Sequence, residues 1–490
     1  MKKILLALLL CVVVLCSVIL IKTFSFTSRQ VESEPIERVT IDKLRAAQNL
    51  SRALQFKTIS SQNPSEFKEA PFLAFHKFLA EAFPNTHSQL KKEVINRYSL
   101  LYTWKGSDES LKPVVLMAHM DVVPVSYGTE SEWTHPPFSG KIADGYVWGR
   151  GSMDDKGCLL AVMEAVEALL AEGYRPRRTV YLAFGHDEEI GGGNGATYIA
   201  KTLESRNVKA EWVVDEGAAI AIGLVPGVTQ PVSLIGIAEK GYMTLVLTAE
   251  QAGGHSSTPP PQSAVGILSS AIHNLQNDPF PANLDGPGML IFDYVGPEMP
   301  FGMKLMFANR WLFNPLIESE LEKADSTNAS IRTTIAPTIF KAGTKENVLP
   351  LKATAMVNFR LLPGDSVEYV IEHVKKAIDD PRVMVTPASH HPQEASAVSD
   401  IHTQGYRMLQ RTIRQVFPRS IVAPFLVLGG TDSKHYQDVS RNIYRFVPMR
   451  ITAEDLGRIH GTNERLGINN LEEMIEFYIQ LIRNSDRAQS

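Results

Sequence analysis

Histidine and acidic residues recur in this chain directly after apolar segments. The apolar segment 113–118 ends at His119, and Asp121 follows two residues later. Because residues i and i+2 of an extended chain lie on one side, Asp121 can contact the ring nitrogen of His119 that faces away from a bound ion. A carboxylate in that position fixes the tautomer of a metal-ligating histidine. Taken alone, this triplet is more typical of loop chemistry or a surface pair.

Further acids follow the next segments of the same kind. They are Asp154 and Asp155 after the glycine-rich turn 149–152, Asp187-Glu188-Glu189 after residues 178–185, and Asp215-Glu216 after residues 210–214. The first pair could simply be helix N-caps, and the triple acid could be a solvated loop. Three adjacent acids repel one another, however, and bound cations would offset that repulsion.

These residue types favour a zinc site. Zinc accepts histidine and carboxylate ligands, and a two-metal site needs one carboxylate that bridges both ions. Asp154, at a predicted helix start, could be this bridge. The candidate ligands are His119, Asp154, Glu189, Asp215 and, as the best late histidine, His460.

The elements that must position these residues alternate between strand and helix. Such alternation predicts an α/β fold, a doubly wound and mostly parallel sheet with helices on both faces. Sites in such sheets lie beyond the carboxyl ends of the strands, which is where the acids and His119 stand. The predicted strands are 98–104, 113–118, 178–185, 210–214 and 422–428, and the predicted helices are 41–53, 70–83, 155–170, 196–203 and 471–482.

The pattern changes at about residue 237. Strands at 240–250, 333–341 and 353–361 and helices at 264–275 and 367–378 predict an inserted α+β lid or dimerisation-type domain, residues 237–392. We expect it to hold a four-stranded antiparallel sheet plus two helices. The catalytic domain would then comprise residues 40–236 and 393–486.

Residues 280–317 form an insertion that is longer than a compact lid domain requires. They are rich in aromatic and methionine side chains, which make adaptable apolar surfaces. Three interpretations stay open: a groove for an acyl chain, an enlarged lid core, and an amphipathic face that contacts a membrane.

The composition of the chain limits the classes of partner and of covalent cross-link that we expect. The chain has 490 residues, is 44% hydrophobic and carries a net charge of −4, which argues against a nucleic-acid partner. Cys11 and Cys16 lie in the leader, so Cys158 is alone and no disulfide framework is expected.

Residues 1–25 form a leader in which two lysines precede an apolar run. We expect a signal peptide cleaved after Ser25 and a secreted protein; an uncleaved signal anchor, giving a single-pass type II membrane protein, is the alternative. The sequons at Asn49 and Asn328 are candidate glycosylation sites on this route.

Several motifs together resemble one known family. They are His-Met-Asp at 119–121, Gly-Arg-Gly-Ser-Met-Asp-Asp-Lys-Gly at 149–157, Asp-Glu-Glu-Ile-Gly-Gly at 187–192, Asp-Glu-Gly at 215–217, Gly-Gly-His-Ser-Ser at 253–257, Gly-Gly-Thr-Asp-Ser at 429–433 and His-Gly at 460–461. In this combination the chain resembles the co-catalytic zinc family of aminoacylases, carboxypeptidase S and related exopeptidases. Segments at 311–313, 331–334, 340–343 and 357–360 look closest to its branch of secreted N-fatty-acyl-amino-acid synthases/hydrolases.

The resemblance implies two zinc ions per chain and a role for each position. One ion would be bound by Asp154, Glu189 and His460, and the other by His119, Asp154 and Asp215, with Asp154 bridging. Asp121 would orient His119. Glu188 would be the general base for the attacking water and then the acid for the leaving amine.

The resemblance also implies groups that bind the substrate. His255, on the lid, would donate to the oxyanion of the tetrahedral intermediate. In dimeric relatives this histidine comes from the partner subunit, so a homodimer is one option and the chain that supplies His255 is open. Arg360 and the backbone around Gly429, Gly430 and Thr431 would bind the substrate carboxylate.

The function implied is that of a secreted di-zinc amidohydrolase that reversibly hydrolyses and condenses N-fatty-acyl amino acids. Its partners would be these small molecules, with contact to a lipid or lipoprotein surface as a further option. The enzyme alternative is a vacuolar, lysosomal or membrane-anchored zinc carboxypeptidase that acts on small peptides. The non-enzyme alternative is a membrane-tethered binding protein, against which the presence of Glu188 argues.

Overall fold

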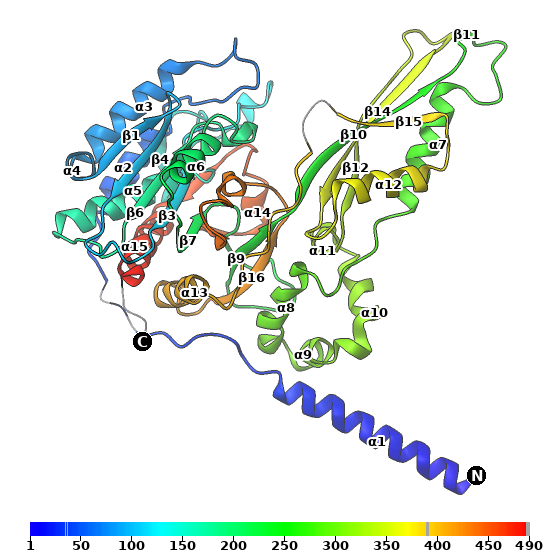
Figure 1. Cartoon of the computed structure of the whole chain (residues 1–490), viewed down its shortest axis with the longest axis horizontal. Helices are drawn as coiled ribbons and strands as arrows, with labels where there is room; N and C mark the ends of the chain where they lie inside the picture. The colour runs from blue at the N-terminus through cyan, green and yellow to red at the C-terminus, as the bar shows by residue number, and fades with distance from the viewer. Residues whose placement is uncertain (35, 37, 389–391, 487–490) are drawn as a thin grey trace.

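Two sheets organise the chain beyond a long N-terminal helix (Figure 1). The computed structural model describes all residues except 35, 37, 389–391 and 487–490. His119 and Asp215 end strands of the larger sheet, and the acidic run 187–189 follows another of its strands. The smaller sheet belongs to an arm that stands away from the larger one.

The larger sheet has ten strands, and its centre is parallel. The apolar strand that ends at His119 lies between two parallel neighbours, one ending at Gly185 and one ending at Asp215. The order is β1 (Lys91–Ile95), β2 (Ser99–Trp104), β6 (Val180–Gly185), β3 (Val114–His119), β7 (Trp212–Asp215), β17 (Ile443–Arg445), β9 (Val232–Glu239), β8 (Ile220–Ala221) and β18 (Arg450–Ile451), with β16 (Ile421–Val427) parallel beside β9.

Side chains of β3 alternate between two cores. Leu116 belongs to the core formed with helices α2 (Lys43–Ala53), α5 (Lys156–Ala171), α13 (Gln404–Val416) and α15 (Ile468–Ser485). Val115 and Met117 face the other core, which contains α6 (Ala196–Ser205). Because a strand alternates its side chains and here both faces are covered, the segment is apolar throughout. The predicted doubly wound, mostly parallel α/β fold is confirmed.

The lid also matches its prediction. Its four strands pair antiparallel in the order β12 (Thr334–Ala342), β14 (Lys352–Leu361), β10 (Gly241–Glu250) and β15 (Val383–Pro387). Helices α7 (Ala264–Asn277) and α12 (Val367–Ile378) share its apolar core. The boundaries at residues 236/237 and 392/393 stay predictions.

Four short helices follow α7 and form a helical corner, residues 290–331. They are α8 (Leu290–Val295), α9 (Phe301–Ala308), α10 (Arg310–Leu321) and α11 (Asp325–Ile331). Their buried apolar side chains pack against one another and against Val232 of β9 and Ile421 of β16. Helix α1 (Lys2–Ser25) adjoins this corner and is long and apolar enough to cross a membrane.

The remaining strands form two small sheets. A three-stranded sheet joins β19 (Arg465–Gly467), β5 (Tyr146–Trp148) and β4 (Lys141–Ala143), and a two-stranded one joins β11 (Gly254–His255) and β13 (Val348–Leu349) at the tip of the lid. Helices α3 (Glu69–Ala82), α4 (Pro84–Gln89) and α14 (Ala453–Leu456) are the other α-helices of the described residues.

Candidate metal centre and active site

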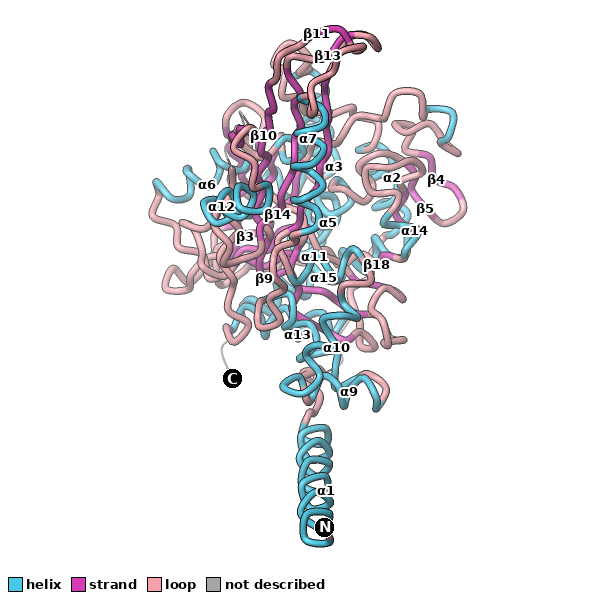
Figure 2. The backbone as a smooth tube through the Cα atoms, turned by 90° about the vertical axis from the view of Figure 1, so that its right-hand side faces the viewer, coloured by secondary structure: helices cyan, strands magenta, loops and turns pink. Residues whose placement is uncertain are grey.

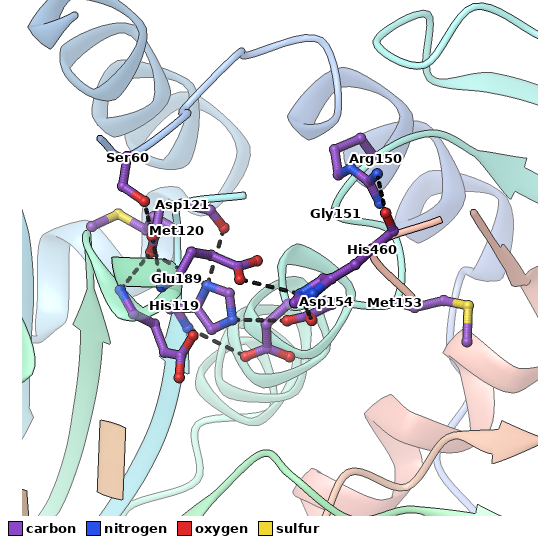
Figure 3. Close-up of polar contacts among 12 residues, drawn as sticks. Ser60, His119, Met120, Asp121, Arg150, Gly151, Met153, Asp154, Glu189 and His460 are labelled. Atoms are coloured by element: carbon purple, nitrogen blue, oxygen red, sulfur yellow. Dashed lines mark hydrogen bonds and ion pairs between the residues drawn. The ribbon is translucent and has the colours of Figure 1, made fainter. Parts of the chain in front are cut away.

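One carboxylate, that of Asp154, lies between two histidines. Nε2 of His119 lies 2.9 Å from its Oδ1, and Nε2 of His460 lies 3.0 Å from its Oδ2. His119 ends β3, whereas Asp154 precedes α5 and His460 follows α14. Figure 3 shows these side chains pointing toward one another. Asp154 therefore occupies the place that a bridging carboxylate requires.

Glu189 joins the same group from the turn after β6. Its Oε2 lies 3.1 Å from Nε2 of His460, and His119, Asp154 and Glu189 place their ligand atoms within 4.8 Å of one another. In the described part of the chain, Oε1 of Glu189 is buried without a hydrogen-bond partner. An unused buried acceptor beside two imidazoles and a carboxylate fits a bound cation.

The end of β7 offers two acids, and the structure places them differently. Oδ2 of Asp215 is buried and accepts a hydrogen bond from the backbone N–H of Ser433 across 2.8 Å. Its neighbour Glu216 instead forms a group of possible ligands with His119 and Glu188. Geometry thus favours Glu216 over Asp215 beside His119.

Asp121 has a wider role than the sequence indicated. Nδ1 of His119 lies 3.0 Å from the backbone oxygen of Asp121 and 3.4 Å from its Oδ1. The same carboxylate accepts from the hydroxyl of Ser60 and from the backbone N–H groups of Glu188 and Glu189. Asp121 therefore holds both a histidine and the turn that carries two acids.

Sequence reasoning missed a buried ion pair that joins two parts of the centre. Nη1 of Arg150 lies 2.6 Å from Oε2 of Glu464, and neither side chain exposes more than 2% of its surface. Glu464 also accepts from the backbone N–H of Asp154, while Nη2 of Arg150 donates to the backbone oxygen of His460. Two signals were available in the sequence: Arg150 lies within the motif at 149–157, and Glu464 lies four residues after His460.

The centre holds more negative charge than its histidines balance. Burial raises the pKa of Glu188 well above its ordinary value, and the neighbouring carboxylates of Asp432, Asp154 and Glu189 raise it further. Burial likewise raises the pKa of Glu216, with further increases from Asp154 and Glu188. Cations among these acids would remove the repulsion, so the donor set fits a metal centre.

A cavity of about 690 Å³ opens between this centre and the lid. Glu188, Glu189 and His460 of the centre line it together with Arg360 of the lid, whose guanidinium lies 4.9 Å from the centre of the Tyr242 ring. The structure thus brings the predicted carboxylate-binding arginine into the same cavity as the predicted base.

The predicted loop 429–431 contributes unequally. Gly429 and Gly430 line the cavity. Thr431 is buried, and its backbone N–H and hydroxyl both donate to Oε1 of Glu239. The hydrogen bonds of Thr431 therefore fix the conformation of the loop, whereas the backbone of the two glycines is accessible to a ligand in the cavity.

Other predicted sites lie outside this centre. His255 is exposed in β11, at the tip of the lid and away from the larger sheet (Figures 1 and 2). Asn49 is buried in α2 and donates to Oε1 of Glu164 across 2.7 Å, a bond that a glycan would have to displace. Asn328 is half-buried in α11 and is the less obstructed of the two sequons.

Residues 280–317 do not line either cavity beside the centre. Phe292, Tyr294 and Phe307 are buried in the core of the helical corner. That core contacts the amino ends of β9 and β16, whereas the cavity lies at their carboxyl ends, where Glu239 and Gly429 line it. A strand of eight residues such as β9 separates the two by more than 20 Å at about 3.3 Å per residue.

Comparison with known proteins decides the family. The family model described as "Peptidase family M20/M25/M40" matches residues 115–484, which contain every candidate metal ligand and Glu188. The chain belongs to this family. The prediction of an enzyme, a zinc-dependent amidohydrolase, is thereby confirmed at the level of the family, and so is the resemblance on which it rested.

Curated relatives cover almost the whole chain. The "Probable carboxypeptidase S-like 2" of Dictyostelium discoideum is 43% identical over 95% of this chain and 91% of its own length. The "N-fatty-acyl-amino acid synthase/hydrolase PM20D1" of Xenopus tropicalis is 40% identical over 99% and 95%, and its human counterpart is 40% identical over 91% and 89%.

Solved structures share the fold at low identity. The M20 family metallo-carboxypeptidase Sso-CP2 of Sulfolobus solfataricus aligns with a TM-score of 0.66 at 18% identity, over 91% of this chain and 100% of that one. Human carnosine dipeptidase 1 aligns with a TM-score of 0.62 at 16% identity, over 91% and 96%.

Proposed function

We propose that this chain is a two-zinc amidohydrolase that hydrolyses N-fatty-acyl amino acids to a fatty acid and an amino acid, and condenses them in reverse. The observation that carries this proposal is the position of Arg360 in one cavity with Glu188 and His460. An N-acyl amino acid has a carboxylate for the guanidinium and an amide carbonyl for the metal centre. The PM20D1 relatives are named for this activity.

Asp154 would bridge the two ions, as its position between His119 and His460 supports. Glu189 and His460 would complete one ligand set. His119 would share the other with an acid from the end of β7, predicted as Asp215 and favoured by geometry as Glu216. Zinc supplies, when bound, polarisation of the amide carbonyl and a water of lowered pKa.

Glu188 would move the protons. Its carboxylate takes a proton from the attacking water and passes it to the amide nitrogen, which leaves as the free amine of the amino acid. Asp121 supports this step by holding the backbone N–H of Glu188. Condensation runs the same steps in reverse, so reactant concentrations set the net direction.

The acyl chain would enter a second, adjoining cavity of about 360 Å³. Phe425, Val427 and Leu428 line this cavity beside Asp154 and Glu216. This apolar wall, and not residues 280–317, is the acyl-binding surface that we propose. Each buried methylene contributes about 0.8 kcal/mol at most.

His255 would act from a second copy of the chain, because in its own chain it lies at the tip of the lid. Mixing His255→Ala with Glu188→Gln protein tests this assignment. Exchanged dimers regain activity if one chain supplies Glu188 and the other His255. Continued inactivity after confirmed subunit exchange would assign His255 to its own chain or to no catalytic role.

A carboxypeptidase acting on small peptides is the second candidate. It is favoured by the 43% identity to a relative named carboxypeptidase S-like 2. A peptide also has a terminal carboxylate and a scissile amide, so the same residues would serve both reactions. The two candidates differ in what fills the cavity beyond the amide carbonyl.

Hydrolysis by the purified, zinc-loaded chain separates the candidates. We expect kcat/KM for long-chain N-acyl amino acids to exceed that for dipeptides, and condensation to be measurable with fatty acid and amino acid in excess. Glu188→Gln protein is the control for contaminating activity. Preference for dipeptides would support the carboxypeptidase instead, and hydrolysis of neither substrate class would refute both.

A further inference from the structure

Helix α1 is docked against the helical corner through its last turns. The buried amide of Asn309 donates from Nδ2 to the backbone oxygen of Ile19 across 3.2 Å and to Oγ1 of Thr23 across 3.1 Å. Both Asn309 and Thr23 are fully buried at this junction. The ring of Phe24 lies 6.2 Å from that of Phe301. These contacts exist only in a chain that keeps α1.

Large apolar side chains stay exposed beside this junction. Trp311 exposes 52% of its surface and lies under Nζ of Lys22, 5.4 Å from the centre of its ring. A contiguous exposed apolar surface marks a contact with a protein or a membrane. The apolar rim consists of Phe301, Trp311, Leu312 and Leu316, all on α9 and α10.

The remainder of α1 indicates what covers this rim. The helix has 24 residues, and its apolar stretch that is long enough to cross a membrane is not buried in the protein. About 20 apolar residues cross the hydrocarbon core of a bilayer. Figures 1 and 2 show α1 projecting from the body beside α9, with the lid tip at the opposite end. Within the rim, Trp311 lies beside Lys22 and Phe301 beside Phe24, where α1 would leave the hydrocarbon.

We propose that α1 is retained as a membrane anchor and that the apolar rim inserts into the lipid interface beside it. Tryptophan and lysine are the side chains that favour this layer, because each combines an apolar body with a polar end. The rim would hold the catalytic domain against the bilayer instead of leaving it on a loose tether. Where the proposed function holds, amphiphilic substrates would thus reach the enzyme from the lipid layer.

Tryptophan fluorescence of the full-length chain in nanodiscs tests the insertion. The chain has five tryptophans, and the other four, Trp104, Trp133, Trp148 and Trp212, each expose at most 7%. Phosphatidylcholine with bromine on the upper acyl chain should quench Trp311, relative to the same lipid without bromine. The quenched component should disappear in Trp311→Phe protein.

A second variant controls for orientation. Leu351 exposes 68% of its surface and lies two residues after β13, which is at the lid tip, far from α1. Trp311→Phe combined with Leu351→Trp moves the exposed tryptophan to that end, where bromine should not quench it. The proposal is overturned if brominated lipid quenches the wild type and Trp311→Phe protein equally, or quenches the Leu351→Trp position. It is also overturned if the intact mass of the chain from secretory cells lacks residues 1–25. None of these readouts depends on the substrate, so they stand apart from the proposed function.

Discussion

The backbone N–H of Glu188 donates to Oδ1 of Asp121 across 3.1 Å, so the carboxylate behind His119 also holds the turn of the proposed base. The N–H of Glu189 donates to the other oxygen of the same carboxylate, also across 3.1 Å. One buried side chain thus sets the positions of a histidine on β3 and of two acids after β6. Asp121 therefore positions both the proposed metal ligands and the proposed proton-transferring residue, Glu188.

We expect Asp121→Asn to impair the centre without unfolding the chain. An amide offers only one acceptor oxygen, so one of the two N–H groups that reach Asp121 loses its partner. Changes to groups that orient metal ligands typically cost about 10–100-fold in metal affinity or activity. Zinc titration and kcat would both be measured. Ser60→Ala, which removes a hydroxyl donor from the same carboxylate and leaves both N–H groups, should be much milder; equal effects would contradict this account.

Glu188→Gln should leave metal content unchanged and lower kcat. Glutamine keeps the size of the side chain but cannot carry the proton, and general acid–base catalysis is typically worth about 10²–10⁴-fold. Metal analysis and kcat on the same preparation measure the two effects separately. Full activity, or loss of a metal ion, would mean that Glu188 has been assigned the wrong role.

Substitutions of the two acids after β7 should have different effects on metal binding. Glu216→Gln should release one of two ions, because Glu216 lies with His119 and Glu188. Asp215→Asn should keep both ions, because its carboxylate is engaged by the N–H of Ser433. The measurement is the number of zinc ions per chain after dialysis. The reverse result would restore Asp215 to the ligand position that the family resemblance implies.

Features that depend on residues close together in the chain could be predicted from the sequence, whereas features that depend on distant residues could not. His119 and Glu189 could be placed because each directly follows an apolar strand, and parallel strands end at one edge of a sheet. Which acid after β7 faces the centre could not be deduced, because adjacent residues point to opposite sides and the deciding neighbour is Ser433, 218 residues away.

Composition alone could not choose among the three interpretations of residues 280–317. It does not say that part of this segment packs against the amino ends of β9 and β16. The sequon at Asn49 suggested an accessible amide, yet its helix turns that face toward Glu164. The lid was predictable because its strands and helices show the two distinct hydrophobic periods.

The buried pair of Arg150 and Glu464 should matter for stability as well as for metal binding. Arg150→Met leaves a buried carboxylate without its partner, which typically costs about 3–5 kcal/mol. Urea unfolding of the metal-free chain measures this cost, and Arg150→Lys should fall in between. Arg52→Met, which removes an exposed pair with Glu81, should cost below about 1 kcal/mol. Similar losses for Arg150→Met and Arg52→Met would argue against a structural role for the buried pair.

The two ends of the substrate should respond to different substitutions. Arg360→Ala removes the guanidinium from the cavity that Glu188 and His460 line, so every substrate with the same carboxylate should suffer. Hydrogen bonds to charged groups contribute about 1.5–3 kcal/mol, which corresponds to about 10–150-fold in kcat/KM.

Leu428→Ser changes the apolar wall of the adjoining cavity and should damage long acyl chains selectively. The difference between short and long substrates should grow by at most about fourfold for each methylene that loses its contact, at about 0.8 kcal/mol each. The measurement is kcat/KM for N-acetyl and for long-chain N-acyl forms of one amino acid, with both variants and the wild type. Arg382→Ala, on the lid surface beside Asp380, is the control for loss of an arginine as such. If Arg360→Ala spared the N-acetyl substrate, or Leu428→Ser affected both substrates alike, the proposed placement of carboxylate and acyl chain would be wrong.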